Sequence, residues 1–354
     1  MFERSITPVQ LASSLFLEQL ADDAHFDIFG FTQDRLISAT QHENFSPASI
    51  NTQGVITQGS HVSVVIFAEG LSLAKVLAAS ASLSEYFTVL HFKMLRMPHL
   101  PGQGIVLKVQ HNSEQDWRPI LEKVANEQRV ELCLVDTPPC LHQPGLLVMD
   151  MDSTAIGVEC IDEMAILAGV GDEVSRVTEQ AMQGKLDFAQ SLISRVGCLA
   201  GADASILHQV RCALPLMPGL YNLVKVLKGY HWKLAIASGG FSYFADHLNE
   251  RLELDWAVAN ELVIVDGKLT GQVAGSIVDA RVKADTLVEL ASRWGISASQ
   301  TVAMGDGAND LLMMNAAALG VAFHAKPVVR HQADISIRQG SLDALLWVLA
   351  VTPK

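Results

Sequence analysis

The sequence predicts an α/β protein with a Rossmann-like, doubly wound parallel sheet and a helical cap insert, preceded by an α+β ferredoxin-like domain. Short continuous apolar runs alternate with helical segments in the second half, as in parallel sheets whose strands are buried on both faces. A helix-rich insert at about residues 160–225 separates the first two runs. Six elements in the order β-α-β-β-α-β come before them, which is the ferredoxin-like order.

Residues 1–60 form an N-terminal segment whose structure the sequence leaves unclear. Residues 9–20 have helix-like apolar spacing, whereas residues 41–59 are polar and rich in Ser, Asn, Gln and Gly, as in a loop. We therefore predict no fold for this segment.

The ferredoxin-like domain is predicted at residues 61–140. Runs rich in Val and Ile favour strands, and apolar residues at helical spacing favour the two helices between them. Strands are expected at 61–70, 87–97, 104–110 and 130–137, and helices at 71–86 and 116–129.

A proline-rich segment, TPPCLHQPG, separates this domain from the predicted core at residues 146–354. Four buried strands are expected in the core, and the cap is inserted after the first of them. The strands are predicted from the runs GLLVMD, KLAIAS, TVAMGD and GVAF.

Composition excludes several classes of protein. The chain carries 25 basic and 38 acidic residues, a net charge of −13, which argues against binding to nucleic acid or to an anionic membrane surface. No apolar stretch approaches the roughly 18 residues of a spanning helix, and the N-terminus lacks the layout of a signal peptide. Five widely spaced cysteines favour reduced thiols. We expect a cytoplasmic protein.

The strongest chemical signal is the segment DMDST, directly after the first core strand. Its two carboxylates, Asp150 and Asp152, follow a buried strand, where open α/β sheets bind their ligands. A simple turn that closes the strand is the alternative for this motif taken alone.

Three further segments lie at corresponding places. The loop GDGAND supplies Asp306 and Asp310 after another core strand, and Ser238 with Gly239 ends a third as a hydroxyl and backbone N–H groups suited to an anion. Lys283 lies at the start of an amphipathic helix. Each segment alone has a simpler alternative: GDGAND would be an ordinary loop, the Ser238 segment a plain turn, and Lys283 a solvated surface lysine. Their coincidence at one sheet edge favours a joint site.

Together these residues fit phosphoryl transfer. Carboxylates from two strands suit Mg²⁺, which prefers oxygen ligands, and Asp150 is placed to attack phosphorus as a nucleophile. Mg²⁺ and Lys283 would neutralise the anionic site. Asp152 would protonate the leaving oxygen and later deprotonate water.

DMDST, SGG, the lysine and GDGANDL, in that order, resemble the four motifs of the haloacid dehalogenase-like phosphohydrolases. Further residues resemble the phosphoserine phosphatase branch of that family: Glu159 after the first motif, Arg195 in SLISRVGCLAG, and Met182 and Phe188 around AMQGKLDF. The resemblance covers about residues 146–330. Met151, where an aromatic residue is common, is a small departure.

The resemblance implies a role for each matching residue. Asp150 would be the nucleophile and Asp152 the acid/base. The implied metal ligands for Mg²⁺ are Asp150, the backbone carbonyl of Asp152, and Asp306, with Asp310 supporting the site. The implied substrate-binding residues are Ser238, Gly239, Lys283, Asn309, Glu159, Arg195, Met182 and Phe188.

Two pairs among these residues have other readings. Glu159 and Arg195 suit the ammonium and carboxylate of O-phosphoserine, although a surface ion pair between cap and core is the alternative. Met182 and Phe188 would close over the substrate, or belong simply to the core of the cap.

The implied activity is a phosphoric monoester hydrolase, a phosphoserine phosphatase that releases L-serine and phosphate through an aspartyl-phosphate intermediate, as the last step of serine biosynthesis. The alternatives are a phosphotransferase, a phosphatase for another small ester, an amino-acid-sensing protein with a vestigial phosphatase half, and a scaffold without a small-molecule ligand. The ferredoxin-like domain is similar to ACT modules, which raises two expectations: a homodimer through this domain and serine bound to it.

Overall fold

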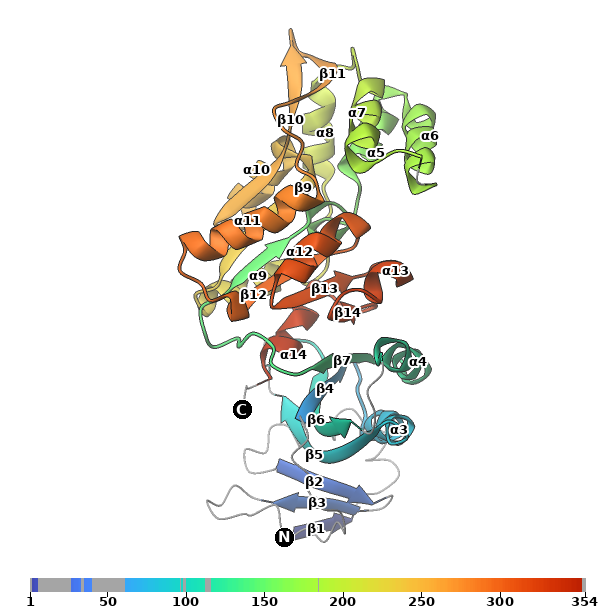
Figure 1. Cartoon of the computed structure of the whole chain (residues 1–354), viewed down its shortest axis with the longest axis vertical. Helices are drawn as coiled ribbons and strands as arrows, with labels where there is room; N and C mark the ends of the chain where they lie inside the picture. Colours follow the sequence, from blue (N-terminus) through green and yellow to red (C-terminus); the bar gives the residue numbers. More distant parts are fainter. Residues whose placement is uncertain are drawn as a thin grey trace. The chain divides into compact units, whose positions relative to one another are not determined.

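The computed structural model describes residues 2–5, 27–32, 35–39, 61–95, 97, 100–111, 116–183 and 185–351. The chain divides into two compact units, each described below by itself: residues 1–138 with 343–354, and residues 139–342 (Figure 1). The expectations for residues 9–20 and 41–59 lie outside the described residues.

The first unit contains an antiparallel sheet in the order β1-β3-β2-β5-β6-β4-β7. The predicted β-α-β-β-α-β order is confirmed, and three strands from residues 1–60 extend the sheet beyond β5. The strands are β1 (Phe2–Ser5), β2 (Asp27–Thr32), β3 (Arg35–Ala39), β4 (His61–Ala68), β5 (Phe87–Leu95), β6 (Gln103–His111) and β7 (Glu131–Val135).

Two helices, α3 (Leu73–Leu83) and α4 (Arg118–Gln128), share an apolar core with one face of this sheet. Alternate residues of β4, such as Val64 and Ile66, enter that core, because successive strand residues point to opposite faces. At the C-terminus, Trp347 of α14 (Leu345–Leu349) lies against Gly104 of β6.

The second unit contains a seven-stranded sheet in the order β11-β10-β9-β8-β12-β13-β14, parallel except for β11. The predicted parallel α/β core is confirmed. Its strands are β8 (Leu146–Met149), β9 (Lys233–Phe241), β10 (Trp256–Val265), β11 (Lys268–Ala274), β12 (Thr301–Gly305), β13 (Leu319–Phe323) and β14 (Ile335–Ile337).

The strand order reverses at β8, because the chain continues to β9 on one side and later returns to β12 on the other. Ligands bind at such switch points in open α/β sheets, beyond the carboxyl ends of the strands. Every residue of β8 and β12 is buried, so helices cover both faces of the sheet there.

Helices and short helical turns complete this part of the second unit. Residues of α11, α12 and α13 share one apolar cluster with β8, β9, β12 and β13. The helices are α9 (Leu220–Gly229), α10 (Ser242–Leu252), α11 (Ala280–Arg293), α12 (Leu311–Ala316) and α13 (Pro327–Arg330), with short turns at Ala298–Gln300 and Ala308–Asp310.

The predicted helical insert is also confirmed. It lies between β8 and β9 and consists of α5 (Cys160–Ala168), α6 (Gly171–Met182), α7 (Phe188–Cys198) and α8 (Ser205–Ala213) (Figure 1). We call these four helices the cap. Within the described ranges, no helix has the length and apolar character needed to cross a bilayer.

Candidate active site

Asp150 lies at the carboxyl end of β8, at the switch point of the sheet. Its backbone N–H donates to the carbonyl of Met304 in β12 at 2.9 Å, and its carboxylate accepts the N–H of Met151 at 2.7 Å. The following turn bends sharply at Ser153, which has φ +56°. This turn leaves the Asp150 side chain almost completely buried at the sheet edge.

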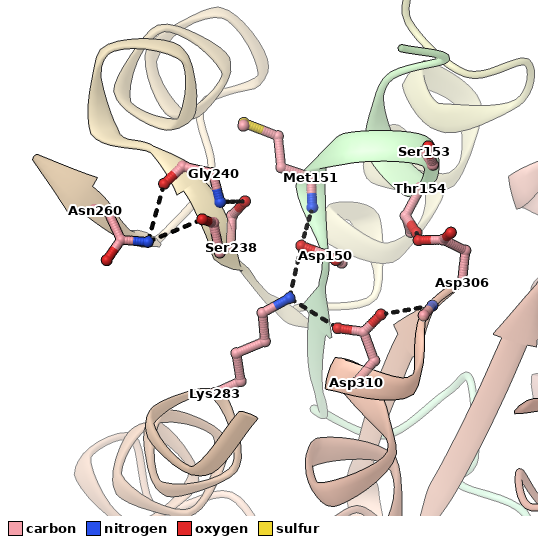
Figure 2. Close-up of polar contacts among 12 residues, drawn as sticks. Asp150, Met151, Ser153, Thr154, Ser238, Gly240, Asn260, Lys283, Asp306 and Asp310 are labelled. Atoms are coloured by element: carbon pink, nitrogen blue, oxygen red, sulfur yellow. Dashed lines mark hydrogen bonds and ion pairs between the residues drawn. The ribbon is translucent and has the colours of Figure 1, made fainter. Parts of the chain in front are cut away.

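Lys283 joins two acidic segments (Figure 2). It lies in the first turn of α11, which Asp279 caps, and its Nζ is 2.9 Å from Asp150 Oδ1 and 2.8 Å from Asp310 Oδ1. Burial alone would lower the pKa of Lys283, but the two carboxylates outweigh burial and raise it. The lysine is therefore a permanent cation within the site.

Asp306 and Asp310 lie on the turn after β12. Asp310 Oδ2 accepts the Gly307 N–H at 3.0 Å, and Asp306 Oδ1 accepts the Thr154 hydroxyl at 3.4 Å (Figure 2). Burial, with the charges of Asp150 and Glu159, raises the pKa of Asp306 to about 7. The turn therefore holds carboxylates whose ionisation needs further positive charge.

One carboxylate oxygen from each of Asp150, Asp306 and Asp310 lies within 4.8 Å of the others. Carboxylate oxygens are the donors that Mg²⁺ prefers, so these residues fit a divalent cation. The side chain of Asp152, for which a backbone-carbonyl ligand was predicted, is not in this group.

Asp152 accepts the backbone N–H of Cys160 at 3.2 Å. Burial, followed by the charge of Glu159, raises the pKa of Asp152 to about 8. A protonated carboxyl that can donate to a leaving oxygen is therefore present at neutral pH. A Cβ on Gly240 would overlap the Asp152 carboxylate, so this side chain fits closely against the carboxyl end of β9.

Ser238, Gly239 and Gly240 lie near the carboxyl end of β9. Ser238 Oγ accepts the Gly240 N–H at 2.9 Å (Figure 2). Asn260 of β10 donates to the carbonyls of Gly239 and Gly240 at 2.9 and 3.3 Å, and accepts the Val278 N–H at 2.8 Å. Asn260 was not predicted as a site residue, although a lone amide in the apolar run AVANELVIV is a usable signal.

The two residues predicted to bind the amino-acid part of the substrate interact electrostatically. Glu159 accepts the Ser153 hydroxyl at 2.7 Å. Loss of hydration raises the pKa of Glu159, whereas the guanidinium of Arg195 acts to lower it. Arg195 Nε is buried and has no hydrogen-bond partner in the described part of the chain. The guanidinium thus retains a free donor.

The cap reaches the carboxyl end of β9 through Phe188, the first residue of α7. A Cβ on Gly239 would lie 2.5 Å from Phe188 Cζ, so the ring lies over this glycine. Asn309 lies against Gly307 on the turn after β12. Met182 ends α6, and its side chain is outside the described residues.

Ser153 and Thr154 are further residues without a predicted role, although both belong to DMDST. Ser153 holds Glu159, and Thr154 holds Asp306. Their hydroxyl groups, next to the carboxylates of the motif, were the sequence signal that could have identified them. Around the motif residues, a layer of short polar side chains therefore orients the acids.

Residues 145–318 match the model of the haloacid dehalogenase-like hydrolase family. The chain is 55% identical over 238 residues to a phosphoserine phosphatase from Haemophilus influenzae, covering 67% of this chain and 76% of the relative. It is 54% identical over 229 residues to one from Vibrio cholerae, covering 65% of this chain and 70% of the relative.

Two solved structures are also similar. The first, of a probable phosphoserine phosphatase from Vibrio cholerae without ligand, has a TM-score of 0.69 and 45% identity, covering 81% of this chain and 86% of that one. The second, a substrate-bound phosphoserine phosphatase complex, has a TM-score of 0.56 and 39% identity, covering 58% of this chain and 99% of that one.

Proposed function

The chain belongs to the phosphoserine phosphatases of the haloacid dehalogenase-like hydrolase family, and we propose that it acts through a phosphoryl group carried by Asp150. It is a phosphoric monoester hydrolase of serine biosynthesis that converts O-phospho-L-serine to L-serine and phosphate. One observation carries the proposed mechanism: Lys283 contacts Asp150 directly, within a group of carboxylates at the switch point of the sheet.

In the first step, a carboxylate oxygen of Asp150 attacks phosphorus and the bond between phosphorus and the serine oxygen breaks. Asp152 gives its proton to that oxygen, which leaves as the serine hydroxyl. The raised pKa of Asp152, about 8, supports this role as an acid at neutral pH. Lys283, the Ser238 hydroxyl and the N–H group of Gly239 would hold the phosphoryl oxygens.

In the second step, Asp152 is a carboxylate and takes a proton from water as the water oxygen attacks phosphorus. The bond between Asp150 and phosphorus breaks, which releases phosphate and restores both aspartates. The same group thus acts first as an acid and then as a base.

We propose Mg²⁺ as the cation, held by Asp150, Asp306 and the backbone carbonyl of Asp152, with Asp310 in support. The close carboxylates and the raised pKa of Asp306 support a cation at this point. When bound, Mg²⁺ would supply positive charge that polarises the phosphoryl group and offsets repulsion of the attacking carboxylate.

Substrate choice is assigned to residues beside the phosphoryl site. Glu159 would bind the ammonium of O-phosphoserine, and Arg195, with its free buried Nε, would bind the carboxylate. Phe188 over Gly239 would limit the entry of water, and Met182 and Asn309 remain predicted contacts.

The test is phosphate release from a panel of phosphorylated metabolites, with and without Mg²⁺ and with and without acceptor alcohols. We expect Mg²⁺-dependent release that is fastest from O-phosphoserine and little transfer to the alcohols. Dominant transfer would indicate a phosphotransferase. Absence of release from every ester would favour the amino-acid-sensing alternative.

We also propose that the ferredoxin-like part of the first unit supports dimerisation and binds serine. The order β4-α3-β5-β6-α4-β7, similar to ACT modules, supports this proposal. Analytical ultracentrifugation of the full chain, combined with calorimetric titration of serine, tests both parts. A monomer that takes up no serine would contradict it.

A further inference from the structure

The two ends of α7 carry different predicted substrate contacts. Phe188 begins the helix, and Arg195 lies in its last turn. Seven residues at 1.5 Å each place them about 10 Å apart along the helix axis. Contacts that hold the C-terminal end of α7 therefore affect the position of Arg195 more strongly than they affect the position of Phe188.

The chain after α7 is joined to the hairpin formed by β10 and β11. Gly201 N–H donates to the Leu269 carbonyl at 2.8 Å, and Leu269 N–H donates to the Ala202 carbonyl at 2.9 Å. Ala204 N–H donates to the Gly267 carbonyl at 2.8 Å. These backbone bonds attach the end of α7 to a strand of the core sheet.

A β-bulge in β11 lies beside this attachment. The pairing shifts from Leu262 opposite Val273 to Ile264 opposite Leu269, so extra residues are accommodated in β11. Gly271, at φ +80°, lies within the extra segment. Bulges bend a strand and redirect it, and are frequent beside active sites.

The bulge contacts α7 at very short range. A Cβ on Gly271 would lie 2.8 Å from Ala200 Cβ and 3.3 Å from Gly197 Cα. Gly197 belongs to α7 and follows Arg195 by two residues. Only a glycine in β11 therefore allows the helix to approach the strand this closely.

We propose that Gly271 is a positioning residue that sets the depth at which Arg195 faces the carboxylate of the substrate. The core sheet holds β11 through β10, the bulge presents Gly271 to α7, and the anchored helix end carries Arg195. This inference rests on the proposed function, because it assigns Arg195 to the carboxylate.

The experiment measures KM and kcat of Gly271→Ala with O-phosphoserine and with O-phosphoethanolamine, which lacks the carboxylate. We expect KM for O-phosphoserine to rise about tenfold, because a charge-assisted hydrogen bond is misplaced. The kcat/KM value for O-phosphoethanolamine should stay at the wild-type level. A purely structural defect would lower activity toward both esters.

Gly275→Ala is the matched control, because Gly275 follows β11 directly and has φ +68° but no atom within 4 Å of an added Cβ. It carries similar backbone strain without the contact. Ala200→Val enlarges the contact from the cap side and keeps the inference testable if Gly271→Ala does not fold. We expect Ala200→Val to change KM as Gly271→Ala does.

Equal KM values for O-phosphoserine in Gly275→Ala and the two contact variants would overturn the inference. A parallel loss of activity toward both esters would overturn it as well. Failure of the proposed function is seen separately, because the wild-type protein would then release no phosphate from O-phosphoserine.

Discussion

Lys283 and Asp310 form an ion pair of 2.8 Å in which both side chains are completely buried. The lysine also contacts Asp150, and the second oxygen of Asp310 holds the N–H of Gly307. One cation thus links the proposed nucleophile to the turn that carries Asp306. The positions of the site carboxylates depend on this link.

Lys283→Met should destabilise the protein by about 3–5 kcal/mol at pH 8, because it leaves buried carboxylates without their partner. Burial and Asp150 raise the pKa of Asp310, and loss of the lysine raises it further. The destabilisation should therefore shrink at pH 5.5, where the acids take up protons. Thermal unfolding in chelator at both pH values measures this, with the exposed Lys185→Met as control. A destabilisation by Lys283→Met that is larger at pH 5.5 than at pH 8 would contradict the prediction.

Mg²⁺ should stabilise the protein more at pH 8 than at pH 6. Without metal, the pKa of Asp306 is about 7 and that of Asp152 about 8, both above the ordinary aspartate value of 3.8. At pH values between the ordinary and the raised pKa, the folded protein binds more protons than the unfolded chain does. The free energy of unfolding of the metal-free protein therefore falls as the pH rises through this range. Mg²⁺ must displace such protons and binds more weakly at low pH.

The measurement is the rise of the unfolding temperature with increasing Mg²⁺ at each pH. Asp306→Asn, which removes one ligand, should abolish most of the rise at pH 8. Equal rises at the two pH values would show that the acids do not compete with metal for protons.

Gly240→Ala should lower kcat by about a hundredfold, because its Cβ would displace the Asp152 carboxylate from its working position. Gly239→Ala is the matched control: its Cβ would meet the end of the Phe188 ring, which can rotate away. We expect a smaller loss there. Steady-state kinetics measure kcat of both variants. If Gly240→Ala and Gly239→Ala lose equal amounts of kcat, the placement of Asp152 is contradicted.

Arg195→Ala should raise KM for O-phosphoserine by about a hundredfold and change kcat much less, because the guanidinium binds a part of the substrate remote from phosphorus. Arg176→Ala is the control, since this cap arginine is exposed and forms a surface ion pair with Glu173. An unchanged KM in Arg195→Ala would remove its role in carboxylate recognition.

Much of the core and its site was predictable because local sequence determines both. Continuous apolar runs indicated the parallel strands, and the acids that follow them were expected at one edge; Asp150, Asp306 and Asp310 do meet there. Strand order follows from pairing between distant segments, which the pattern of one strand does not reveal. The switch point at β8 was therefore visible only in the fold.

The residues that were missed act through tertiary contacts. Asn260 resembles any strand residue until β10 lies beside the glycines of β9, and Gly271 resembles an ordinary strand glycine until α7 lies against it. The strands β1, β2 and β3 were not predicted because they are only four to six residues long, and their pairing in the sheet is not visible in so short a pattern. Such features depend on neighbours far away in the sequence.

The most direct test of phosphoryl transfer through Asp150 is phosphate release from O-phosphoserine by Asp150→Asn. The matched control is Asp285→Asn, which changes an exposed aspartate on α11. We predict that Asp150→Asn unfolds at a temperature close to that of the wild type but loses at least about 10³-fold in kcat, because an amide cannot carry the phosphoryl group. Hydrolysis near the wild-type rate by Asp150→Asn would contradict the proposed mechanism.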